Sequence, residues 1–107
     1  MVKVLVIDDS AIAREMISTI LMTDSEIEVI GKSSNGKEAI EFLKNIHIKP
    51  DIITCDLQMP IMDGFETIEY IMAYQPTPIL IVTVLLIPTG RWAERQRKKA
   101  RHRPRTW

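Results

Sequence analysis

The centre of the sequence reads Asp51-Ile52-Ile53-Thr54-Cys55-Asp56-Leu57-Gln58-Met59-Pro60-Ile61-Met62-Asp63-Gly64. Its first half is mostly apolar, as is typical of a strand that is covered on both faces of a parallel sheet. Pro60 cannot continue a strand ladder and Asp63-Gly64 favours a turn, so the strand ends close to Asp56. Open α/β sheets bind their ligands at the carboxyl ends of the strands. The stretch therefore predicts that Asp56 lies at a ligand-binding edge.

Strands and helices are expected to alternate on both sides of this stretch. The strands are predicted at 2–7, 28–33, 52–57 and 79–87, and the helices over 10–22, after Asn35-Gly36 and after Gly64. The apolar residues expected to face inward are Ile12, Met16, Ile17, Ile20 and Leu21 in the first helix, Ala39, Ile40, Leu43 and Ile46 in the second, and Phe65, Ile68, Ile71 and Met72 in the third. This alternation predicts a single α/β domain with a parallel sheet and right-handed crossovers.

Composition places the chain among ordinary globular proteins. Its 107 residues suffice for one modest core, and 46% of them are apolar. The single cysteine, Cys55, excludes an internal disulfide, and its apolar neighbours favour a small buried hydrophobe over a nucleophile. We find neither a signal peptide nor an apolar run of the roughly 20 residues that span a bilayer. The expected location is the cytoplasm, with no membrane partner.

The net charge of zero hides two oppositely charged parts. Residues 1–90 hold six basic and thirteen acidic side chains, a net charge of −7, whereas residues 91–107 hold eight basic side chains and Glu94, a net charge of +7. Such a division is typical of a folded body followed by a tail.

Three carboxylates are predicted to meet if the first and third strands are neighbours. Asp8 and Asp9 follow the first strand and Asp56 ends the third, so all three would lie at one sheet edge. An all-oxygen cluster without His or Cys suits Mg²⁺. A carboxylate beside Mg²⁺ can act as a nucleophile toward phosphorus, because the metal offsets the charge that builds on the transferring group. The hydroxyl of Thr83, in the otherwise apolar run 79–87, could bond an oxygen of that group.

These residues together resemble the receiver domain of two-component response regulators. The resemblance rests on Asp8-Asp9-Ser10, on the Asp-Leu-Gln-Met-Pro-Ile-Met-Asp-Gly that begins at Asp56, and on Thr83 after Ile-Leu-Ile-Val, and it covers about residues 1–84. It implies a doubly wound, flavodoxin-like sheet with the strand order 2-1-3-4. It further implies that Asp56 accepts a phosphoryl group from the phosphohistidine of a sensor histidine kinase. By the same resemblance Asp9 binds Mg²⁺ directly, Asp8 binds it mostly through water, Gln58 lends its backbone carbonyl and Thr83 is the switch hydroxyl.

Within this family, the sequence is most similar to the N-terminal receiver of chemotaxis protein-glutamate methylesterases. The similar segments are Asp-Asp-Ser-Ala, Met-Pro-x-Met-Asp-Gly and Thr-Pro-Ile-Leu-Ile-Val-Thr. A full-length relative of that kind is an esterase. No esterase domain is present in these 107 residues, so we do not expect this chain by itself to be an enzyme.

The resemblance stops from Leu85 onward. The sequence predicts an incomplete receiver over 1–87, truncated after the fourth strand, with the fifth strand and the last two helices missing or replaced. Residues 88–107 are expected to be a basic tail outside the family, either disordered or a short helix, and their composition is typical of a foreign or out-of-frame terminus. We assign the phosphate-binding lysine of the family to no position here.

Three functions stay open on the sequence. The first is a phosphoacceptor domain that uses Mg²⁺ and Asp56. The second is a truncated receiver that self-associates through the apolar edge strand at 79–87 and has no signalling output. The third is nucleic-acid binding by the arginine-rich residues 91–107, and a disordered tail, free or lying against the acidic surface of the body, is favoured over it.

Overall fold

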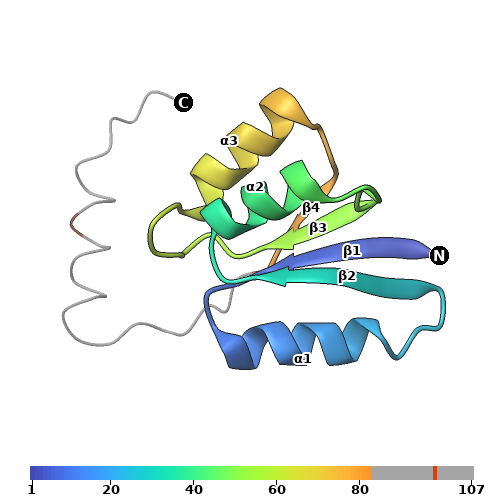
Figure 1. The fold of residues 1–107 in the computed structure, drawn as a ribbon. Coiled ribbons are helices and arrows are strands. Elements are labelled where there is room, and N and C mark those ends of the chain that lie inside the picture. Colours follow the sequence, from blue (N-terminus) through green and yellow to red (C-terminus); the bar gives the residue numbers. More distant parts are fainter. Residues whose placement is uncertain (83–97, 99–107) are drawn as a thin grey trace, which may run out of the picture.

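A computed structural model describes residues 1–82 and Lys98, and Figure 1 shows its fold. The elements in chain order are β1 (Val2–Ile7), α1 (Ala11–Leu21), β2 (Ile27–Ser33), α2 (Gly36–Asn45), β3 (Ile52–Cys55), α3 (Gly64–Tyr74) and β4 (Ile79–Ile81). None of the helices in residues 1–82 combines the length and apolar character that crossing a bilayer requires.

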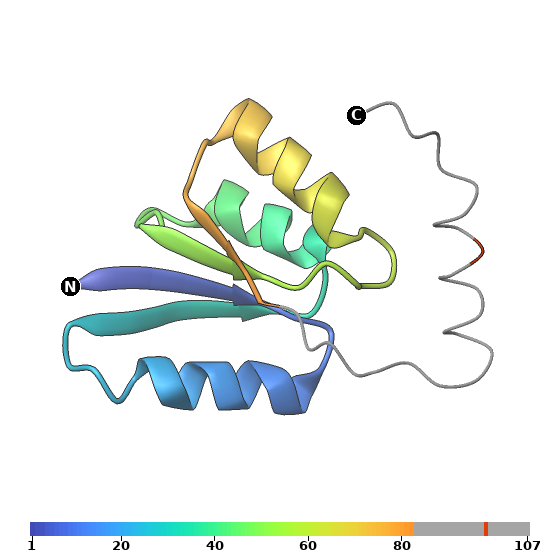
Figure 2. The ribbon, with the colours of Figure 1, turned by 180° about the vertical axis from the view of Figure 1, so that it is seen from behind.

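The sheet has the order β2-β1-β3-β4, and all three strand pairs are parallel. Helix α1 covers one face, whereas α2 and α3 cover the other, as Figures 1 and 2 show from opposite sides. The predicted doubly wound, flavodoxin-like sheet with the order 2-1-3-4 is therefore confirmed. The expectation of a missing or replaced fifth strand and last helices falls on residues 83–97 and 99–107, outside the described part.

The main core lies between the sheet and the helices α2 and α3. Its strand residues are fully buried and come from alternate positions of the two central strands: Leu5, Ile7, Ile53 and Cys55. Ala39, Leu43 and Ile71 pack on them from the helices. The inward stripe predicted for α2 is confirmed at Ala39, Ile40 and Leu43, while Ile46 is half-buried and follows the end of the helix. Burial, together with the charges of Asp56 and Asp8, raises the pKa of the Cys55 thiol to about 11, so it stays protonated at neutral pH.

Side-chain caps fix where the three helices begin. The Oγ of Ser10 accepts a hydrogen bond from Ala13 N at 3.2 Å. Asn35 caps α2 and Asp63 caps α3 in the same way, each over 2.9 Å. Ser10 therefore caps α1, and the carboxylate of the preceding Asp9 is left for other contacts.

The inward stripe predicted for the first helix is wrong at three of its five positions. Ile12, Met16 and Ile20 are 75%, 59% and 66% exposed, because α1 turns its neighbouring stripe toward the sheet. The buried residue in that stripe is Ser18, whose hydroxyl donates to Arg14 O at 2.7 Å. This bond within the helix satisfies the hydroxyl and allows its burial.

The third helix also departs from its predicted stripe. Ile71 is buried as expected, but Phe65 is 63% exposed and Met72 is also exposed. Thr67 takes the inward place and is fully buried, with its Oγ1 donating to Asp63 O at 2.7 Å. As in α1, a small self-bonded polar residue packs where a larger apolar one was expected.

Two strand ends differ from the prediction. Strand β3 ends at Cys55, because Asp56 and Leu57 already belong to the loop. Strand β4 ends at Ile81, and of the predicted run 79–87, residues 83–87 lie outside the described part.

The loop after β3 contains a strained residue, Ile61. Its φ is +69°, and Met62 N donates to Pro60 O at 2.7 Å, which makes Ile61 the centre of a γ-turn of the rare positive-φ kind. A β-branched side chain disfavours this region of φ. The side chain is exposed, so the described packing does not offset the strain.

Replacing Ile61 by Gly is expected to stabilise the fold by about 1 kcal/mol. Relief of the strain, roughly 1–3 kcal/mol, outweighs the roughly 0.4–1 kcal/mol that Gly costs through the unfolded state. Urea unfolding followed by circular dichroism measures the difference. Ile48→Gly, at an exposed loop position without a positive φ, is the matched control and should destabilise. Equal losses in both variants would contradict the assignment of strain.

Candidate functional site

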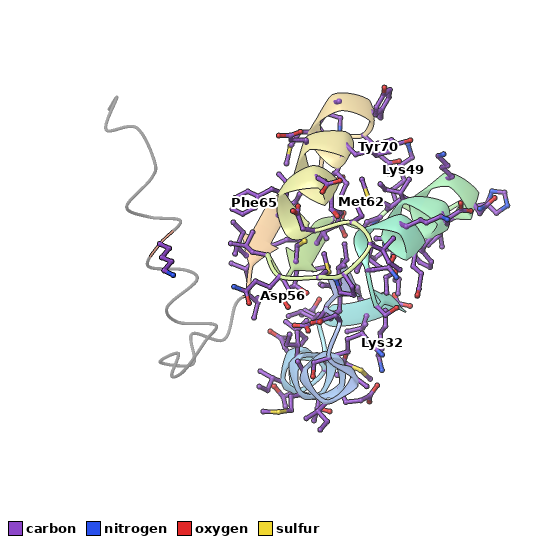
Figure 3. The ribbon with its side chains drawn as sticks, turned by 90° about the vertical axis from the view of Figure 1, so that its left-hand side faces the viewer. Lys32, Lys49, Asp56, Met62, Phe65 and Tyr70 are labelled. Atoms are coloured by element: carbon purple, nitrogen blue, oxygen red, sulfur yellow. The ribbon has the colours of Figure 1, made fainter. Side chains whose placement is uncertain are left out.

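The candidate site lies at the carboxyl ends of β1 and β3. The register pairs Ile7 with Cys55, so Asp8 and Asp56 leave neighbouring strands side by side. Asp56 N donates to Ile7 O, and Asp8 N donates to Ser33 O, each at 3.0 Å. Figure 3 views the sheet from this end and shows Asp56 there. The backbone of Asp8 and Asp56 is therefore held by the sheet itself.

Three carboxylates meet at this edge. Asp8, Asp9 and Asp56 each offer one oxygen, and these oxygens all lie within 4.8 Å of one another. Asp8 is buried, Asp56 is half-buried and Asp9 is exposed. An all-oxygen set that is open on one side fits a hard divalent cation that keeps several waters, such as Mg²⁺.

The electrostatics of the cluster disfavour its ionised form. Burial is the main cause that raises the pKa of Asp8, and the charge of Asp9 adds to it, while the N–H of Ser10 acts in the opposite direction. Burial likewise raises the pKa of Asp56, with further contributions from Asp8 and Asp9 and an opposing hydrogen bond from Gln58 N. A cation at this point would offset both the repulsion and the lost hydration.

Arg14 is a site residue that sequence reasoning missed. Its Nη1 donates to Asp8 O at 2.7 Å, and its charge lowers the pKa of Asp8. The bond ties the first turns of α1 to the end of β1. A signal was present, since helical side chains lean toward the amino terminus and an arginine one turn into this helix can reach back to the sheet edge.

Gly64 brings α3 close to the loop that carries Asp56. Gly64 N donates to Leu57 O at 3.1 Å, and a Cβ on Gly64 would lie only 2.6 Å from Leu57 Cα. A side chain at position 64 is therefore excluded on steric grounds. Met59 anchors the same loop, because its side chain is buried in the core.

The predicted site residues divide into three groups. The structure brings Asp8, Asp9 and Asp56 together. Gln58 lies beside them, with its backbone N–H donating to Asp56 Oδ1 at 3.2 Å, and the metal-binding part of its carbonyl stays a prediction. Thr83 lies outside the described residues, so its part as the switch hydroxyl stays a prediction too.

Comparison with known families matches residues 4–86 to the response regulator receiver domain. The chain belongs to this family. The expected resemblance to receivers of chemotaxis methylesterases is confirmed as well. A protein-glutamate methylesterase/protein-glutamine glutaminase of Carboxydothermus hydrogenoformans is 48% identical over 84 residues, and one of Pseudoalteromonas translucida is 51% identical over 84 residues.

Solved receiver structures share the fold. The response regulator domain of Thermotoga maritima CheB is 37% identical with a TM-score of 0.72, over 78% of this chain and 60% of that one. A chain in the CheX-CheY-BeF3-Mg complex of Borrelia burgdorferi is 29% identical with a TM-score of 0.70, over 78% and 63%. The two methylesterases are matched over 78% of this chain but over only 23% and 21% of their own length. The chain thus spans less than a quarter of these curated relatives.

Removing one charge from the cluster is expected to stabilise the metal-free protein. At neutral pH the ionised Asp56 is destabilising, because its pKa is higher in the folded protein than the ordinary value of 3.8. Asp56→Asn should therefore raise the free energy of unfolding by on the order of 1 kcal/mol, the common size of a single substitution's effect. The gain should fade as the pH falls through the raised pKa toward 3.8.

Thermal unfolding in excess chelator at several pH values measures this gain. Asp24→Asn is the matched control, since Asp24 is exposed and lies outside the cluster, and its hydrogen bond from Glu26 N can be kept by Asn. A gain for Asp56→Asn no larger than that of the control would contradict the raised pKa of Asp56, which burial causes first and the charges of Asp8 and Asp9 second.

Proposed function

We propose that this chain is a phosphoacceptor domain in which the carboxylate of Asp56 receives a phosphoryl group from the phosphohistidine of a sensor histidine kinase. The observation that carries the proposal is the convergence of Asp8, Asp9 and Asp56 within 4.8 Å at the carboxyl edge of the sheet. Asp56 is half-buried, which leaves it accessible to a donor, whereas Asp8 is buried.

Mg²⁺ is the cofactor that the donor set fits. Asp9 would bind it directly, Asp8 mostly through water, and Asp56 and the backbone carbonyl of Gln58 would complete the protein ligands. Bound Mg²⁺ supplies positive charge against the transferring phosphoryl group. The related Borrelia burgdorferi complex is one of CheX and CheY with BeF3 and Mg, which supports a magnesium site in this family.

The transfer uses one oxygen of Asp56 as the nucleophile. A bond forms between that oxygen and phosphorus while the bond between phosphorus and the histidine nitrogen of the donor breaks, and the imidazole keeps the electron pair. The neighbouring Cys55 does not compete, because burial holds its thiol protonated. Thr83 is proposed to bond an oxygen of the transferred group.

The domain boundaries and the cellular setting belong to the same proposal. We take residues 1–87 as the receiver and 88–107 as a tail outside it, and the family match that extends to residue 86 supports this boundary. The sensor kinase is the expected partner, and the cytoplasm the expected location. An esterase activity is proposed only for longer relatives, of which this chain spans less than a quarter.

A second candidate function is a self-associating receiver fragment without signalling output. It is favoured by β4, which ends the described sheet and whose Leu80 and Ile81 are 52% and 49% exposed. Nucleic-acid binding rests on residues 91–107, which lie outside the described part, and we do not expect it.

Intact mass after incubation with Mg²⁺ and acetyl phosphate tests the phosphoacceptor proposal. The unmodified sequence should gain the mass of one phosphoryl group, and excess chelator should abolish the gain because the repelling carboxylates then lack their cation. Asp56→Asn should not be labelled. Asp63→Asn is the matched control and should be labelled, since Asn can keep the helix cap that Asp63 provides.

The proposal would be contradicted by two results. One is the absence of any label on a chain whose circular dichroism shows the folded α/β protein, which would leave the fragment function. The other is equal labelling of the unmodified protein and Asp56→Asn, which would place the acceptor elsewhere.

A further inference from the structure

Strand β4 presents one side of its backbone to β3 and the other side outward. Ile53 N donates to Pro78 O at 2.9 Å, and Val82 N donates to Cys55 O at 3.1 Å. In a parallel pair, alternate residues direct their backbone groups to the same neighbour. The even-numbered residues of β4 therefore face β3, and the N–H and C=O groups of Ile79 and Ile81 point away from it. No strand within residues 1–82 lies beyond this edge.

An apolar surface continues from this edge onto helix α3. Ile79 packs against the core, so Ile81, two residues later, lies on the same sheet face, which α3 also covers. Phe65, Ile68 and Met72 follow helical spacing along one side of α3, and Phe65 and Met72 are exposed. Figure 3 shows Phe65 on the β4 side of α3 and Tyr70 on the side of α2. We call Phe65, Ile68, Met72 and Ile81 the α3–β4 face.

We propose that the α3–β4 face and the edge of β4 bind a second copy of this chain, with the two β4 strands antiparallel about a twofold axis at Leu80. In this register Ile79 lies opposite Ile81 of the second copy, and each such pair exchanges two N–H to C=O bonds. Four hydrogen bonds then satisfy every outward group of Ile79 and Ile81 in both copies. The self-complementarity of this edge is the reason for choosing a second copy over another partner.

Side chains and charge favour the same occupant. All three residues of β4 are apolar. In the proposed dimer the α3–β4 faces of the two copies would lie at the interface, so apolar surface on both would be buried away from water. None of the four residues of the α3–β4 face and none of the three residues of β4 is charged, so no like charges meet on these residues. The proposal deepens the self-association named above and does not depend on phosphoryl transfer to Asp56.

Sedimentation velocity over a wide concentration range tests the association on the full chain. The unmodified protein should form dimers that persist in ~1 M NaCl, where screening over about 3 Å removes attraction between the acidic body and the basic tail. Ile81→Pro removes two of the four donors and leaves the β3 pairing, since Ile81 N points outward. Ile81→Lys places charge on the edge. Each should raise the dissociation constant by about tenfold or more. Ile20→Lys, an equally polar change at an exposed position on α1, should leave it unchanged.

Cysteine cross-linking tests the register. Residues on the twofold axis form a non-hydrogen-bonded pair with Cα atoms about 4.5 Å apart, within the range that a disulfide spans. Leu80→Cys should therefore form a disulfide-linked dimer under mild oxidation. Ile12→Cys, which is exposed on α1, should not, and the native Cys55 is buried in both variants.

The outcomes separate cleanly. Dimers that resist salt, weaken in both Ile81 variants and cross-link through Leu80→Cys support the proposal. The proposal would be overturned by a monomer at all concentrations or by dimers that dissociate in ~1 M NaCl. It would also be overturned if Ile81→Pro and Ile81→Lys left the dissociation constant unchanged. Circular dichroism of each variant establishes that it is folded before its association is compared. Phosphoryl labelling of Asp56, measured separately, distinguishes failure here from failure of the proposed function.

Discussion

The parallel register of β1 and β3 is the constraint on which the site depends. It pairs Ile7 with Cys55, so the next residue of each strand is an aspartate at the same sheet edge. Neither backbone can withdraw, because Asp56 N is bonded to Ile7 O and Asp8 N to Ser33 O. The repulsion is therefore built in by the sheet, which is stabilised by the apolar core below, and only a proton or a cation can relieve it.

The sequence predicted the residues that follow the end of a strand. It predicted much less well which side chains pack against other elements of the fold. Asp8 and Asp56 were found because each follows an apolar run, and the order of the strands came from the family resemblance. Periodicity also located the helices, but two adjacent stripes of α1 have similar apolar content, and spacing does not say which faces the sheet. Ser18 decides it, since a small hydroxyl that bonds within its own helix can pack more closely than Met16.

Residues that position the backbone of the site, without belonging to the carboxylate cluster, were harder to predict. Gly64 is needed because a Cβ at this position would lie 2.6 Å from Leu57 Cα, a clash that the fold sets and that residue spacing does not predict. The reach of Arg14 to the sheet edge could have been predicted, because helical side chains point toward the amino terminus of their helix. Its partner is a backbone carbonyl, however. Every residue has one, so the sequence does not indicate which carbonyl an arginine will bind. The polar residue types of a site are thus easier to predict than the contacts that hold them.

The carboxylate site and the β4 edge differ in how well the strands that carry them are covered by the rest of the fold. The central strands β1 and β3 each have a strand on both sides and hold the fully buried side chains Leu5, Ile7, Ile53 and Cys55, so the carboxylates at their ends stand on the best buried part of the described domain. Strand β4 has one described neighbour and half-exposed side chains, so it is the least supported. The two parts are nevertheless joined, because Val82 N donates to the carbonyl of Cys55, the residue before Asp56. Strand β4 is thus bonded along one side to the strand that ends at the acceptor loop and presents its other side outward, so the surface proposed for association and the carboxylate site share one strand pair.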